Sequence, residues 1–98
     1  MLYRFYVGQG KALASHRQAQ WVYEADFWAA TKFDGFTRFD AEGGWYGDFG
    51  YEREPAIVWE VFSGEDIPES AIRGFKSYLR ELFDQQSVLC LKLAAEEV

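Results

Sequence analysis

The chain has 98 residues, of which 49% are hydrophobic and 19% aromatic, and its formal net charge is −6. This length fits a single domain, residues 1-98, and the acidic balance argues against a protein that binds DNA or RNA polymers, which needs a basic surface. A single cysteine excludes an internal disulfide, and no apolar run suits a secretion signal or a membrane span, so we expect a cytoplasmic protein without membrane partners.

The first third of the chain predicts a strand followed by a helix. Residues 2–7 are β-prone and end at Gly8, and residues 8–11 are expected to form a flexible loop. Ser15 and Gln18 match a capping box, which predicts a helix that begins there and ends near Phe33. Its inner stripe follows helical spacing, whereas Tyr23 and Phe27 point the other way. The stripe comprises Trp21, Val22, Ala25, Trp28, Ala29 and Phe33.

Residues 35–64 predict one long β-hairpin. We place its turn at Gly47-Asp48-Phe49-Gly50, because glycine tolerates the positive φ that tight turns require. The two arms, 35–46 and 51–64, are longer than the usual strand of about 5–6 residues. We therefore expect the hairpin to project beyond the body of the domain.

The last third predicts a second helix and a final strand. Asp66 is the expected N-cap, with Pro68 inside the first turn and Glu69 three residues after the cap. Residues 87–93 alternate as the last strand. The apolar face of the helix comprises Ile72, Phe75, Leu79, Leu82 and Phe83, and its opposite, charged face is interpreted as solvated surface.

The predicted order of elements is β-α-β-β-α-β. With right-handed crossovers this order gives a ferredoxin-like α+β fold, a four-stranded antiparallel sheet with both helices on one face. The first and third strands should be central. The helices leave the other face of the sheet, which we call the open face, to meet solvent, a ligand or another subunit.

Strand alternation predicts which side chains point to each face. Those expected in the core are Tyr3, Phe5, Val7, Thr37, Phe39, Ile57, Trp59, Val61, Leu89, Leu91 and Leu93. Those expected on the open face are Arg4, Tyr6, Phe36, Arg38, Asp40, Val58, Glu60, Phe62, Val88, Cys90 and Lys92. The open face of this acidic chain would thus gather three cations, Arg4, Arg38 and Lys92.

Two interpretations of these cations remain open. In one, Glu60 pairs with Arg4 or Arg38 on a partly apolar dimer face. In the other, guanidinium groups hold a small anionic ligand, plausibly a nucleotide, against aromatic rings. The predicted ligand-binding residues are Arg4, Tyr6, Lys11, Arg38, Trp45, Glu60, Phe62 and Lys92.

Catalytic and metal signatures are weak. His16, the only histidine, is expected in the first turn of a helix, and Cys90 has no recognisable histidine partner. One histidine and one cysteine do not make the usual zinc site, and the carboxylates show no spacing typical of an acid and base pair. We therefore predict no catalytic residue, metal or cofactor, and leave enzymatic activity as an alternative.

Short pieces of the hairpin carry a resemblance: Gly35-Phe36-Thr37, Gly44-Trp45, and Glu54-Pro55 followed by a β-run to Glu60. With the apolar last strand, they resemble a group of small uncharacterised proteins found in phage and bacterial genomes. The resemblance spans most of the chain and implies a ferredoxin-like fold, a phage or prophage origin and the host cytoplasm as location. Small phage proteins of this kind often resemble counter-defence factors, which block a host protein or sequester a signalling nucleotide.

Three functions follow as hypotheses. The first is a non-enzymatic accessory protein, a homodimer or higher homo-oligomer, that binds and sequesters a small anionic molecule. The second is an acidic inhibitor of a host defence protein, which would use carboxylates along the hairpin. The third is a small dimeric ferredoxin-like enzyme. The carboxylates of the second hypothesis are Asp40, Glu42, Asp48, Glu52 and Glu54.

Overall fold

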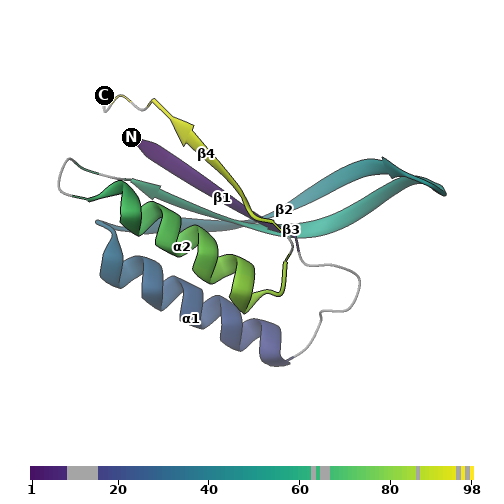
Figure 1. Cartoon of the computed structure of the whole chain (residues 1–98), viewed down its shortest axis with the longest axis horizontal. Helices are drawn as coiled ribbons and strands as arrows, with labels where there is room; N and C mark the ends of the chain where they lie inside the picture. Colours follow the sequence, from purple (N-terminus) through teal and green to yellow (C-terminus); the bar gives the residue numbers. More distant parts are fainter. Residues whose placement is uncertain (9–15, 63, 65–66, 86, 95, 97) are drawn as a thin grey trace.

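The structure, a computed structural model, describes residues 1–8, 16–62, 64, 67–85, 87–94, 96 and 98. In chain order its elements are β1 (Leu2–Gly8), α1 (His16–Lys32), β2 (Phe36–Gly47), β3 (Gly50–Phe62), α2 (Glu69–Leu82) and β4 (Leu89–Leu93). The strands form one antiparallel sheet in the order β2-β3-β1-β4, and both helices cover one face (Figure 1). The predicted ferredoxin-like fold is confirmed, with β1 and β3 central.

The core lies between the helices and the sheet and is built largely from aromatic rings. Phe75 of α2 is at its centre, with its ring centroid 4.9 Å from that of Phe5, 5.0 Å from that of Trp28 and 5.6 Å from that of Phe33. The predicted inner stripe of α1 is confirmed, because all six residues are buried or pack against this core. Many of the chain's large rings therefore take the place of aliphatic side chains inside the domain.

The helix starts differ in part from the prediction. Ser15 and Asp66, the expected caps, lie outside the described residues. The N-cap position of α2 is Pro68, which has an extended ψ of 148° and makes no side-chain capping bond. Pro68 therefore precedes the helix instead of lying in its first turn, and Glu69 supplies the acidic side chain that favours a helix N-terminus.

The long hairpin is confirmed. Gly47 pairs with Gly50, which leaves Asp48 and Phe49 in the turn, and Gly50 has the positive φ, 111°, that favours glycine. Pairing between β1 and β3 ends where Gly8 meets Ala56. Residues 42–55, which we call the arm, therefore continue as a two-stranded ribbon that extends beyond the helices (Figure 1).

The predicted faces of β2 and β4 are wrong. Directly paired residues share a face: Arg38 pairs with Trp59, which belongs to the core beneath the helices, and Phe39 pairs with Val58, which does not. Phe36, Arg38 and Asp40 thus lie on the helix side, and Thr37 and Phe39 lie on the open face. In β4, Cys90 pairs with Phe5 and Leu89 with Tyr6. This register puts Val88, Cys90 and Lys92 on the helix side, and Leu89, Leu91 and Leu93 on the open face.

The error has a physical cause. β2 and β4 are the edge strands of the sheet, and both carry apolar side chains on alternate and on intervening positions, so alternation alone does not tell the two faces apart. For β1 and β3 the predicted faces are confirmed, because the core between sheet and helices contains Tyr3, Phe5, Val7, Ile57, Trp59 and Val61. Val58 is also buried, but it pairs with Tyr6 on the open face.

Candidate functional site

The open face is largely apolar around a charged centre. Two rows of paired residues cross the sheet, Phe39–Val58–Tyr6–Leu89 and Thr37–Glu60–Arg4–Leu91. Phe39, Phe62, Leu89 and Leu91 are all exposed large apolar side chains. The surface of a monomeric soluble protein seldom gathers so many exposed apolar side chains. Their presence indicates that this face binds a ligand or another protein surface.

A single ion pair occupies the centre of this face. Arg4 Nε donates to Glu60 Oε2 at 2.6 Å, between directly paired positions of β1 and β3. The two side chains are 38% and 22% exposed, so solvent and ligands reach both. The hydrogen bond to Glu60, and after it a hydrogen bond to Tyr6, raises the pKa of the Arg4 guanidinium above its usual value. One cation and one anion, with Tyr6 beside them, thus lie within an apolar surround.

The other two predicted cations are elsewhere. Arg38 Nε donates to Asp26 Oδ1 at 3.0 Å, and Trp59 Nε1 donates to the same oxygen at 2.8 Å. Arg38 therefore joins β2 to α1 on the helix side. Lys92 lies with its Nζ 6.0 Å from the centroid of the Tyr3 ring, also on the helix side. The predicted gathering of three cations on the open face is wrong, and only Arg4 is there.

Asp26 was missed by the sequence interpretation. It directly follows Ala25 of the apolar stripe of α1, so its carboxylate lies beside that stripe, where it can accept a hydrogen bond from a buried donor. The donor is the indole of Trp59, and it is identified only when α1 packs on the sheet.

Two further predicted residues are not brought to the centre of the open face. Trp45 pairs with Glu52, eight positions before Glu60 on β3, which is about 26 Å at the usual strand rise. Lys11 lies outside the described residues. The structure therefore brings together Arg4, Tyr6, Glu60 and Phe62 from the predicted set.

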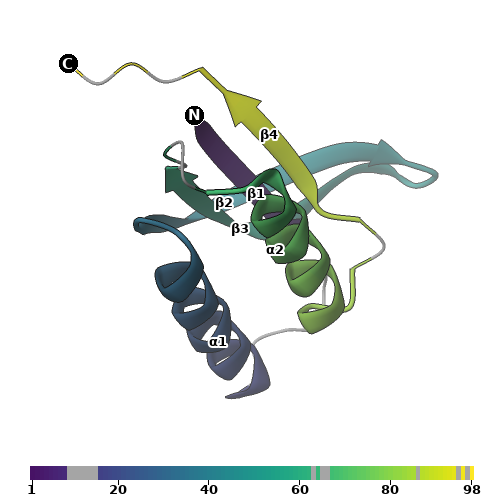
Figure 2. The ribbon, with the colours of Figure 1, turned by 60° about the vertical axis from the view of Figure 1, so that its left-hand side comes forward.

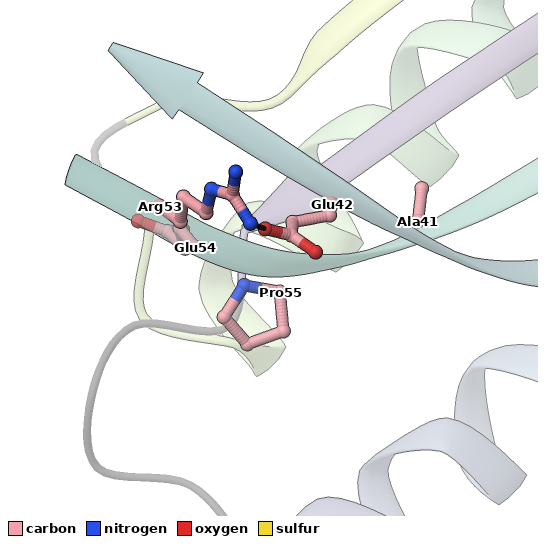
Figure 3. A pocket seen from close by; sticks show the side chains of 5 residues that line it. All are labelled: Ala41, Glu42, Arg53, Glu54 and Pro55. Carbon is pink, nitrogen blue, oxygen red and sulfur yellow. Dashed lines mark ion pairs between the residues drawn. The ribbon is translucent and has the colours of Figure 1, made fainter. Parts of the chain in front are cut away.

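A second, smaller feature lies at the base of the arm. Ala41, Glu42, Arg53, Glu54 and Pro55 line a shallow hollow of about 180 Å³ (Figure 3). Arg53 Nη1 is 3.3 Å from Glu42 Oε1, and both side chains are more than half exposed, so this pair is weak. The Glu54 carboxylate lies so close to Gly8 that a Cβ there would overlap it. The absence of a side chain at Gly8 thus leaves room for Glu54, but the hollow itself is shallow and largely open to water.

Other chemistry has little support in the described part of the chain. It contains no group of three or more His, Cys, Asp and Glu residues placed to hold a metal ion. Burial raises the pKa of the Cys90 thiol, with Lys76 opposing the effect, so the thiol is not an activated nucleophile at neutral pH. None of the described helices has the length and apolar character to span a membrane.

Comparison with known proteins finds similarity in structure alone. No family model matches the sequence, and the search of curated proteins gave no match. Among solved structures, a phage SAM lyase in complex with S-methyl-5′-thioadenosine is similar, with a TM-score of 0.65 and 15% identity over 91% of this chain and 76% of that one. The apo state of a phage SAM lyase is similar with a TM-score of 0.60 and 15% identity over 98% and 91%. At this identity the likeness establishes the fold.

Proposed function

We propose that this chain is a phage-type accessory protein that binds and sequesters a small adenosine-containing molecule, of the S-adenosylmethionine class, on the open face. The observation that carries the proposal is the accessible Arg4–Glu60 ion pair at the centre of an exposed apolar surface. The same fold in a phage SAM lyase bound to S-methyl-5′-thioadenosine supports the choice of ligand class.

The charges of the open face suit a ligand that carries both signs. S-adenosylmethionine has a sulfonium and an ammonium cation together with a carboxylate anion. Glu60 would attract a cationic group, and the planar guanidinium of Arg4 would hold the carboxylate. A nucleoside triphosphate fits less well, because Arg4 is the one cation placed there among the described residues and Glu60 opposes its charge.

Aromatic side chains beside the pair would hold the nucleoside. Tyr6 is next to Arg4 on the open face, and Phe39 pairs with Val58, the neighbour of Tyr6. Phe62 is exposed at the end of β3. A purine ring that stacks on one of these side chains would bury apolar area on both partners.

Cleavage of the bound molecule is a second candidate function. Glu60 is the one carboxylate in the pair at the centre of the open face, and its 22% exposure leaves it able to meet a ligand. A carboxylate in such a setting can act as a general base when a substrate proton lies within hydrogen-bond reach. Sequestration and cleavage would use the same residues. The two functions are distinguished by whether the bound molecule is recovered intact or cleaved.

The proposal is tested by calorimetry with S-adenosylmethionine, S-methyl-5′-thioadenosine, AMP and ATP. We expect S-adenosylmethionine to bind best, and Arg4→Ala and Glu60→Gln each to weaken it by about tenfold or more, equivalent to at least about 1.4 kcal/mol. Arg4→Lys should restore binding in part, because lysine keeps the charge but loses the planar fork. Arg53→Ala on the arm is the matched control.

Two outcomes would count against the proposal: no binding of any of these ligands near millimolar concentration, or equal binding by the wild type and both open-face variants. Mass spectrometry of the ligand after incubation then separates the two candidates. Intact S-adenosylmethionine supports sequestration, and a smaller adenosine product that disappears in Glu60→Gln supports cleavage.

A further inference from the structure

The outer face of α2 is the most basic surface in the described part of this acidic protein. Three of the chain's ten lysines and arginines lie within two turns of the helix. With a serine hydroxyl they line a hollow of about 410 Å³ on the surface. The lining residues, which we call the basic face, are Arg73, Lys76, Ser77 and Arg80.

The positive charge of this face is poorly neutralised within the chain. Arg73 Nη2 is 3.6 Å from Glu69 Oε1, but both side chains are largely exposed, so this pair contributes little. Among the described residues neither Lys76 nor Arg80 has a carboxylate at ion-pair distance. Lys76 does act on the Cys90 thiol, where it opposes the effect of burial on the pKa. The positive charges of the basic face are therefore available to pair with carboxylates of another molecule.

The arm has the complementary character. Residues 42–55 contain four carboxylates and one cation, Arg53. Near the turn the arm also exposes rings: Phe49 is 98% exposed and Tyr46 is 85% exposed. Carboxylates pair with lysine and arginine, and exposed aromatic faces attract guanidinium groups. The carboxylates and the exposed rings of the arm thus both favour a partner surface that is rich in lysine and arginine.

The arm and the basic face of one chain lie apart in the fold. In both views the arm extends away from the helices (Figures 1 and 2). A contact between them must therefore join two copies. We propose that the acidic arm of one copy docks on the basic face of α2 of a second copy.

The symmetry of this contact has consequences. It joins two different surfaces, so it is head-to-tail, and it closes into a ring or continues as a filament. It leaves the open face out of the contact, so it is independent of the proposed ligand site. Because its attraction comes from exposed charges, assembly should weaken as salt rises and the screening length falls to about 3 Å at 1 M.

A charge exchange tests the proposal by sedimentation velocity at low and at about 1 M salt. One variant carries Lys76→Glu and Arg80→Glu, and the other carries Asp48→Lys and Glu52→Lys. Each variant alone should lose the salt-sensitive part of the assembly, which the wild type shows at low salt and loses at about 1 M. An equal mixture should assemble again, because each reversed arm then meets a reversed helix and each native arm a native helix.

The control reverses Lys32 and Asp34, two exposed residues at the end of α1, and should assemble like the wild type. Circular dichroism establishes that every variant is folded. A chain with all four substitutions should assemble alone, which covers the case in which one variant of the pair folds poorly. The proposal is overturned if the wild type shows no salt-sensitive assembly, if folded single-surface variants assemble unchanged, or if neither the mixture nor the four-substitution chain assembles.

Discussion

The body of the molecule and its arm contain the same aromatic residue types in opposite environments. Phe5, Phe75 and Trp59 are fully buried, whereas Tyr46, Phe49 and Tyr51 of the arm are exposed. The body has helices to cover one side of its sheet, but the arm is a two-stranded ribbon that neither of the described helices covers. A ring therefore stabilises the fold in the body, while in the arm it remains available for contact with another molecule.

The largest expected effect comes from the centre of the core. Phe75→Ala removes a ring that contacts four other aromatic side chains, and it should lower the free energy of unfolding by about 3–5 kcal/mol. Phe49→Ala at the tip of the arm is the matched control and should change it by less than about 0.5 kcal/mol. Urea denaturation measures both. Similar losses for the two variants would mean that the arm is packed against something in solution.

A smaller effect is expected where a polar group joins the helix to the sheet. Asp26→Ala leaves the buried indole N–H of Trp59 without its acceptor and Arg38 without its partner. Unfolding should become easier by about 1–3 kcal/mol. The control is Glu42→Ala, which removes the exposed pair with Arg53 and should cost about 0–1 kcal/mol. If both substitutions have the same small effect, water takes the place of the lost Asp26 carboxylate in the Asp26→Ala variant.

The smallest effect on stability is expected on the open face, where the readout is assembly. When no ligand is bound, the exposed apolar side chains there favour a homodimer or higher homo-oligomer through this face, so this association and ligand binding compete. Phe39→Ser with Leu91→Ser should leave the fold intact and shift sedimentation toward the monomer. This association should persist at high salt, because apolar contacts are not screened, which separates it from the charged contact between arm and α2. A wild type that is monomeric at micromolar concentration at both salt levels would contradict it.

Local patterns were enough to predict the elements of the fold. Helical spacing identified the inner stripe of α1, and two glycines around Asp48 and Phe49 identified the turn, because both signals depend on neighbours in sequence. The element order then gave the ferredoxin-like topology. Arg4, Tyr6, Glu60 and Phe62 were placed correctly on the open face, since they belong to the central strands, where one set of positions is clearly apolar.

Only the tertiary structure decided which way the edge strands face. In β2, Phe36 and Phe39 are both candidates for the core, and so are Val88, just before β4, and Leu89, its first residue. Hydrophobicity therefore does not choose between the two registers. Packing chooses, because Asp26 of α1 accepts hydrogen bonds from both Trp59 and Arg38 and so fixes Arg38 on the helix side. That contact joins residues distant in sequence and takes Arg38 off the open face, while the register of β4 against β1, which pairs Lys92 with Tyr3, takes Lys92 off it.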